Sequence, residues 1–249
     1  MKRTFLWLFL PLMAMIFNSC SKDEGGIDIP KYAKLLKMIT NDNGSVLFEY
    51  DDQQRITKVI WSDQAGNPDL VDTYTHINNN VWVSNRWGYS VFFDFDNDGY
   101  IIGENGFRHM YADGHIKTKS SNGYTRTKSE NELGNISSSY TWTNGNLTQI
   151  IGNDVDCTYT YNNVENKLNV NIFDMDGFGI DYMIFDDGDT FTNFKGTFSK
   201  NYPVTAKMGN HTATFSYTYD SEIYPTKIVV DRYNPLEGAK TITYTLTYY

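Results

Sequence analysis

The sequence has few of the side chains from which metal, redox and nucleophilic sites are usually built. It contains 2 cysteines and 4 histidines in 249 residues, and the histidines at 76, 109, 115 and 211 lack the spacing of a ligand set or of a base beside a nucleophile. Basic residues are also few, 21 against 30 acidic ones, for a formal net charge of −9. A binder of single-stranded nucleic acid needs an electropositive groove, so this balance argues against a nucleic-acid partner.

Long apolar runs and helical periodicity are scarce as well. The longest apolar run covers residues 5–17, after Lys2 and Arg3 and shortly before Cys20. At about 13 residues it is shorter than the roughly 20 that a membrane-spanning helix needs, and it is typical of a secretory signal. No later stretch shows a sustained helical period, which indicates an all-β fold.

The end of the signal, with Ser19 before Cys20, resembles the lipobox of bacterial lipoproteins. This resemblance implies that residues 1–19 are removed and that Cys20 is lipidated, which changes the net charge from −9 to −11 as Lys2 and Arg3 are lost. Acyl chains on one cysteine then anchor the protein to the outer membrane of a Gram-negative cell. Residues 20–30, which include two glycines and a proline, are predicted to be a flexible tether, and residues 31–249 a single domain.

The polar residues directly after Cys20 indicate which face of the membrane carries the domain. Lys22, Asp23 and Glu24 resemble the surface-export signal of lipoproteins in some gut-dwelling Gram-negative bacteria, which implies display at the cell surface. The alternative is an ordinary polar tether and a domain at the periplasmic face.

Seven copies of one short pattern organise the rest of the chain. The copy at Phe48, Glu49, Tyr50 and Asp51 is followed by a polar turn, Arg55 and Ile56. Each copy predicts a strand with bulky inward residues two apart, a turn and a returning strand. Turns such as Asn144-Gly145 carry residues that tolerate positive φ. The corresponding aromatic pairs of the other clear copies are Phe93/Phe95, His109/Tyr111, Tyr140/Trp142, Tyr159/Tyr161 and Tyr217/Tyr219, with a degraded copy at residues 127–136.

Repeated hairpins predict one long antiparallel meander of roughly 14 to 18 strands, forming a rolled sheet, a barrel or a sandwich. Residues 168–173 alternate like a strand and are predicted to be the returning strand after Tyr161. Alternation also places Cys157 on the inner face with Tyr159, as a buried and unreactive thiol.

The repeated pattern resembles the YD repeat of rearrangement-hotspot and teneurin-type shells. It is also similar to a family of gut-bacterial lipoproteins known as a domain of unknown function. The resemblance covers residues 35–249, implies a β-hairpin array, and brings no catalytic residue or cofactor with it.

One aromatic cluster falls outside the regular slots of the repeat, at Trp82, Trp87 and Tyr89 with Arg86. Rings flanked by hydrogen-bonding groups are typical of a platform for a sugar or a peptide. The alternative is an ordinary strand in which Trp87, Tyr89, Val91 and Phe93 alternate inward.

Two acidic patterns suggest other chemistry. Asp94, Asp96 and Asp98 before Gly99 match the start of a calcium-binding loop, but the twelfth position is Asn105, and an acidic hairpin turn accounts for the same residues. Carboxylates near Asp176 and Asp187 could serve glycoside hydrolysis. The sequence favours a non-catalytic binding or structural module for a glycan or an envelope protein, with a glycan hydrolase as the alternative.

Overall fold

The computed structural model describes residues 32–63, 65–66, 68–77, 80–84, 90–95, 101–104, 107–112, 115–121, 136–152, 156–173 and 198–249. These ranges form sixteen antiparallel strands and contain no helix with the length and apolar character required to cross a membrane. The strands are β1 (Leu36–Asn41), β2 (Gly44–Tyr50), β3 (Ile56–Ser62), β4 (Pro68–Ile77), β5 (Asn80–Ser84), β6 (Ser90–Phe95), β7 (Ile101–Glu104), β8 (Phe107–Ala112), β9 (His115–Ser121), β10 (Ile136–Thr143), β11 (Asn146–Gly152), β12 (Asp156–Glu165), β13 (Asn201–Met208), β14 (His211–Tyr219), β15 (Pro225–Asn234) and β16 (Gly238–Tyr248).

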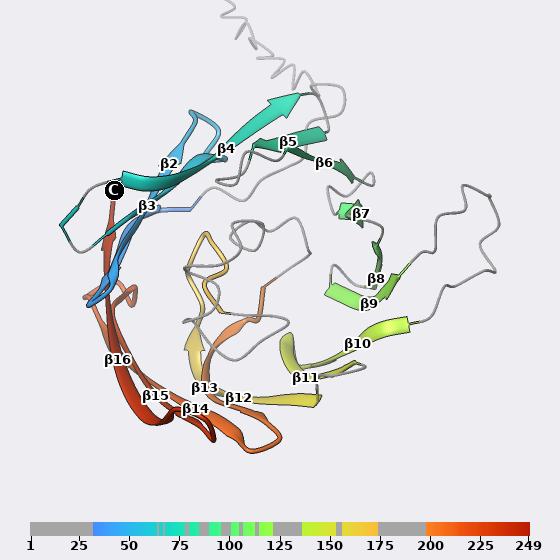
Figure 1. Cartoon of the computed structure of the whole chain (residues 1–249), viewed down its shortest axis with the longest axis vertical. Coiled ribbons are helices and arrows are strands. Elements are labelled where there is room, and N and C mark those ends of the chain that lie inside the picture. Colours follow the sequence, from blue (N-terminus) through green and yellow to red (C-terminus); the bar gives the residue numbers. More distant parts are fainter. Residues whose placement is uncertain are drawn as a thin grey trace, which may run out of the picture.

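The sheet is a closed barrel (Figure 1). Each strand pairs with the strands before and after it in the sequence, and β1 pairs with β16 through the register Leu36↔Tyr248. The backbone N–H of Tyr249 extends this seam by donating to the carbonyl of Leu35 at 3.0 Å. The predicted all-β meander is therefore confirmed, and the pairing of its two outermost strands makes it a barrel. We call the end where β1 begins and β16 finishes the termini end, and the opposite end the far end.

Alternation along the strands separates an apolar inner face from a polar outer face. In β16, Ile242, Tyr244 and Leu246 are buried while the threonines between them lie outside. Phe48, Phe93 and Tyr140, which the repeat assigns to inward positions, are also buried, as is Cys157. Side chains two apart share a face of a strand, so the spacing of the aromatic residues sets which face becomes the core.

Residues 166–173, the inner segment, leave the wall after β12 and run inside the ring of strands (Figure 1). The prediction of a strand at residues 168–173 is wrong. Leu168, Val170 and Ile172 are at most 2% exposed and belong to the main core cluster. Inside a barrel, an alternating apolar segment can bury its side chains without joining the hydrogen-bond ladder, so its period of two does not report a strand.

Two turns at the termini end share one geometry. In residues 51–55 the Asp51 carboxylate accepts hydrogen bonds from the backbone N–H of Gln53 and of Arg55, both at 2.9 Å. In residues 220–224 the Asp220 carboxylate accepts the equivalent pair, again at 2.9 Å. The fourth residue of each turn, Gln54 or Ile223, has positive φ, 63° or 69°. The aspartate after the aromatic pair therefore caps the hairpin turn.

Two other positions depend on special backbone geometry. The predicted two-residue turn is confirmed at Asn144 and Gly145, which have φ values of 52° and 78° between β10 and β11. Gly44 opens β2 with φ 150°, and a Cβ atom there would lie 2.1 Å from the backbone oxygen of Ser62. Glycine at position 44 therefore lets β2 and β3 approach closely.

Candidate functional site

An aromatic hollow lies between the wall formed by β10–β14 and the inner segment. Its free space of about 30 Å³ has room for one or two water molecules, and the empty space amounts to about 500 Å³ when open solvent at its mouth is included. The hollow is lined by Trp142, Leu147, Tyr159, Tyr161, Asn166, Asn171, Phe173, Phe198, Ser199, Pro203 and Phe215.

The polar groups of the aromatic hollow bond to one another and to the wall. The Ser199 hydroxyl donates to the Tyr161 hydroxyl at 3.0 Å, and that hydroxyl donates to the carbonyl of Leu147 at 2.6 Å. The Asn166 amide donates to the carbonyl of Ser199 at 3.2 Å. Burial raises the pKa of Tyr161, so its hydroxyl stays protonated at neutral pH. The lining thus offers ring faces and neutral polar edges, which suit a ligand with an apolar face.

Further tyrosines pack against one another on the inner face of the barrel. The ring centroids of Tyr202 and Tyr217 are 5.2 Å apart, and those of Tyr217 and Tyr219 are 5.8 Å apart with an interplanar angle of 15°. Phe173 of the inner segment meets Tyr217 edge to face at 6.4 Å. Burial raises the pKa of all three tyrosines, so these packed rings are uncharged at neutral pH.

One tyrosine contact occurs in three hairpins. The hydroxyls of Tyr50, Tyr161 and Tyr217 each donate to a backbone carbonyl fourteen residues earlier, at 2.6 to 2.7 Å. Each bond joins the last part of one strand to the start of the strand before it. The bonds fasten β1 to β2, β11 to β12 and β13 to β14 at the termini end.

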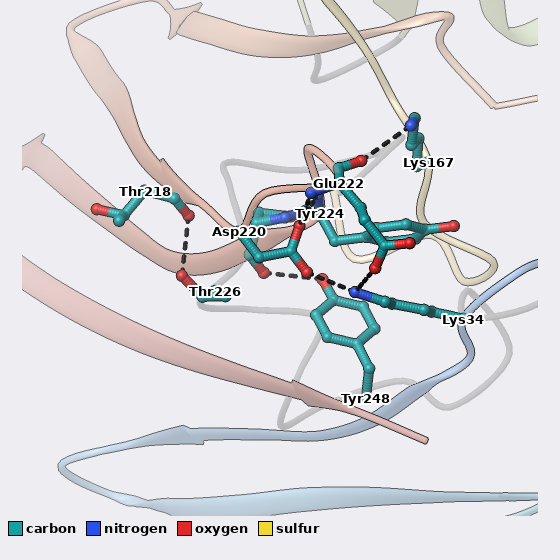
Figure 2. Close-up of polar contacts among 9 residues, drawn as sticks. Lys34, Lys167, Thr218, Asp220, Glu222, Tyr224, Thr226 and Tyr248 are labelled. Atoms are coloured by element: carbon teal, nitrogen blue, oxygen red, sulfur yellow. Dashed lines mark hydrogen bonds and ion pairs between the residues drawn. The ribbon is translucent and has the colours of Figure 1, made fainter.

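The turn at residues 220–224 holds both the inner segment and the residues just before β1 (Figure 2). Lys34 forms ion pairs with Asp220, at 2.7 Å, and with Glu222. Lys167 donates to the carbonyl of Glu222 at 2.9 Å. Both ammonium groups lie over the Tyr224 ring, 5.1 and 5.5 Å from its centroid. The hydrogen bond from Lys34 is the main cause that lowers the pKa of Asp220. We call this contact of three segments the Lys34 clasp.

The described residues separate parts of the predicted aromatic platform. Trp82 lies on the outer face of β5 with 43% of its surface exposed, between the buried residues Val81 and Val83. Arg86, Trp87 and Tyr89 lie outside the described residues. Phe93, the inward end of the alternative strand interpretation, is buried. The aromatic hollow was not predicted as a site, because Trp142, Tyr159 and Tyr161 follow the same core pattern as every other copy of the repeat.

The predicted acidic and lipidation sites fall mainly outside the described residues. Asp94 belongs to β6 and pairs with Gly103, whereas Asp96 and Asp98 are not described. Cys20 and the carboxylates Asp176 and Asp187 also lie outside the described ranges. Among the residues that are described, no three histidine, cysteine or acidic side chains gather as a metal site would require.

No protein-family model and no curated protein matches this sequence. Solved structures with a similar fold include two that are described as porin-like proteins. The structure from Bacteroides uniformis is 12% identical with a TM-score of 0.65, and the match covers 88% of this chain and 99% of that chain. The structure from Bacteroides vulgatus is 14% identical with a TM-score of 0.52, covering 86% of this chain and 99% of that one. At these identities the likeness concerns the fold, and the chain shares the all-β architecture of these two porin-like proteins.

Proposed function

We propose that the chain is a lipid-anchored, surface-displayed envelope protein that acts as a non-catalytic binding module, with a glycan or an envelope protein as its partner. The N-terminal pattern ending in Cys20 supports the anchor, because it combines a short apolar run with a lipidation motif. The sequence Lys22, Asp23, Glu24 after Cys20 supports display at the surface.

The polarity of the barrel wall supports an anchor in place of strands that cross the bilayer. Strands exposed to lipid carry apolar side chains on the outside and polar ones within. The wall from β12 to β16 has the opposite arrangement, with an apolar inner face. Its exposed outer positions include Thr160, Thr214, Lys227, Asp231, Thr241, Thr245 and Thr247. The proposal therefore places this wall in water.

The observation that carries the binding role is the aromatic hollow. Sugar rings present C–H faces that stack on aromatic side chains while their hydroxyls bond to polar edges, and the hollow combines Trp142, Tyr159 and Phe215 with Asn171 and Ser199. Its free space of about 30 Å³ suits a small group that protrudes from a larger ligand. We therefore favour recognition of the end or a substituent of a glycan chain over enclosure of a whole oligosaccharide.

A glycan-array screen of the mature protein tests this binding role. We expect binding that Trp142→Ala abolishes and that Trp82→Ala leaves intact, provided that circular dichroism shows both variants to be folded. Loss of binding in Trp82→Ala alone would place the site on the outer face. Binding that disappears with a chelator would instead implicate Asp94, Asp96 and Asp98. Absence of binding to every glycan would refute the glycan form of the proposal.

Membrane release tests the anchor separately. Cys20→Ala should move the protein from the membrane fraction to the soluble fraction, whereas Cys157→Ala, which changes a buried thiol, should leave it on the membrane. Protease treatment of intact cells should degrade the wild-type domain. Protection until lysis would contradict surface display and favour the periplasmic face.

A further inference from the structure

Large apolar side chains are exposed around the termini end of the barrel. Ile77 and Trp82 are 53% and 43% exposed on β4 and β5. The register pairs Ile77 with Asn80 and Thr75 with Trp82, so the two side chains are diagonal neighbours on the outer face. Ile223 and the C-terminal Tyr249 are 46% and 58% exposed at the same end. We call these four residues the apolar rim.

Apolar side chains are also exposed toward the far end, at Val71, Ile151, Tyr233 and Leu236, so the choice of the termini end rests on Ile223 and on the tether. Ile223 is the most informative member of the apolar rim. It occupies the fourth position of the turn at residues 220–224 with φ 69°, a conformation that suits glycine or asparagine and disfavours a β-branched side chain. The equivalent position in the other turn holds the polar Gln54, with φ 63°. An exposed isoleucine in a strained position is not explained by the fold of the turn, and strain that the fold does not need is a pointer to function.

The tether begins at the same end. Twelve residue steps separate Cys20 from Tyr32, and Tyr32 is bonded to the turn at residues 51–55 through Gln54 at 2.8 Å. A flexible chain of that length has a root-mean-square reach of about 20 Å and a maximum of about 40 Å. A lipid on Cys20 would therefore hold the termini end close to the bilayer, at an effective concentration in roughly the millimolar range.

Several charges near the apolar rim are held in ion pairs. Arg55 pairs with Asp51 at 2.6 Å, and Lys34 pairs with both Asp220 and Glu222, which leaves one excess negative charge beside Ile223. Lys37 lies 5.1 Å from the centre of the Tyr249 ring. Tryptophan, tyrosine and lysine at the edge of an apolar surface are the side chains that favour the headgroup region of a bilayer.

We propose that the apolar rim docks the termini end of the barrel onto the bilayer that holds the lipid anchor, with Trp82, Ile77, Ile223 and Tyr249 in the headgroup region. The inference rests on the proposed lipidation of Cys20. It assigns Trp82 to a lipid surface instead of a glycan, and it turns the far end of the barrel away from the membrane.

Fluorescence quenching of the purified, lipidated full-length protein tests this docking. The protein is reconstituted into phosphatidylcholine vesicles with or without brominated acyl chains, which quench only tryptophans that reach the bilayer. We expect quenching in the wild type that Trp82→Phe removes and that Trp142→Phe, a change inside the barrel, leaves unchanged. Ile223→Asn should reduce the quenching at least twofold, whereas Leu236→Asn, which changes a 93% exposed residue at the far end, should have no effect.

The failures of docking and of anchoring are distinguishable in this experiment. Protein that stays on the vesicles but shows no quenching at Trp82 would overturn the docking and leave the anchor intact. Equal loss of quenching in Leu236→Asn and Ile223→Asn would also overturn it, because the contact would not be specific to the termini end. Protein that does not remain on the vesicles would overturn the anchor, and the inference with it.

Discussion

Replacement of Ile223 by asparagine should stabilise the protein. The left-handed conformation costs an ordinary L-residue about 1–2 kcal/mol, and asparagine is among the residues that tolerate it best. Because the Ile223 side chain is 46% exposed, its removal forfeits only part of the burial that an isoleucine gains in a core. We expect Ile223→Asn to raise the free energy of unfolding by about 1 kcal/mol, which corresponds to about 2–4 °C in Tm for a domain of this size.

The control is the same change in a different backbone conformation. Ile151 is 48% exposed in β11, where asparagine is disfavoured, so Ile151→Asn should lower the free energy of unfolding by up to about 1 kcal/mol. Urea denaturation followed by circular dichroism measures both changes. A decrease for Ile223→Asn that equals the decrease for Ile151→Asn would refute the argument from backbone strain. Together with the docking experiment, these variants test whether stability is given up at position 223 for membrane contact.

Three further substitutions and one titration test other features of the barrel. Tyr217→Phe should lower the free energy of unfolding by about 1–2 kcal/mol, because the carbonyl of Pro203 loses its donor; an unchanged urea midpoint would contradict the bond. Gly44→Ala should lower it by about 1–3 kcal/mol, since the added Cβ meets the Ser62 oxygen, and a wild-type Tm would show that β2 and β3 are not so close. Ile172→Ala should lower the free energy of unfolding by about 2–5 kcal/mol, because this fully buried side chain of the inner segment fills the core. A loss below about 1 kcal/mol, measured by calorimetry, would contradict this packing. Because burial raises the pKa of the inward tyrosines, their contribution to stability should be constant below about pH 10, and stability should fall above it as the unfolded chain ionises; tyrosinate absorbance that rises without loss of the circular dichroism signal would oppose this.

Features governed by local rules could be predicted from the sequence. The spacing of Phe48 and Tyr140 within their copies of the repeat identified inward positions, because side chains on a strand alternate between faces whatever the rest of the chain does. The Asn144-Gly145 turn was predicted for a similarly local reason, since few residue pairs tolerate positive φ at both positions.

Features that depend on distant partners could not be predicted. The pairing of β1 with β16 joins residues more than 200 positions apart, and both strands alternate like all the others. The segment containing Leu168 and Ile172 has the same alternation, and only the surrounding wall decides that it fills the interior. The interval from Tyr161 to Leu168 is seven residues, against five from Trp142 to Leu147, but the interval from Tyr219 to Ile228 is nine in a copy that stays in the wall, so this spacing does not reveal the inward path. The aromatic hollow follows from that path and was missed with it.

The seam between β1 and β16 has a consequence for how the protein matures. Every other strand can pair with its neighbour as soon as that neighbour is synthesised, which favours rapid local folding. The first strand must wait for the last, so its edge stays open until residues 238–248 are available. A chain cut short before β16 would leave both β1 and β15 as unpaired edges, and such edges promote aggregation. Closure of the barrel therefore depends on β16, the last strand to be made.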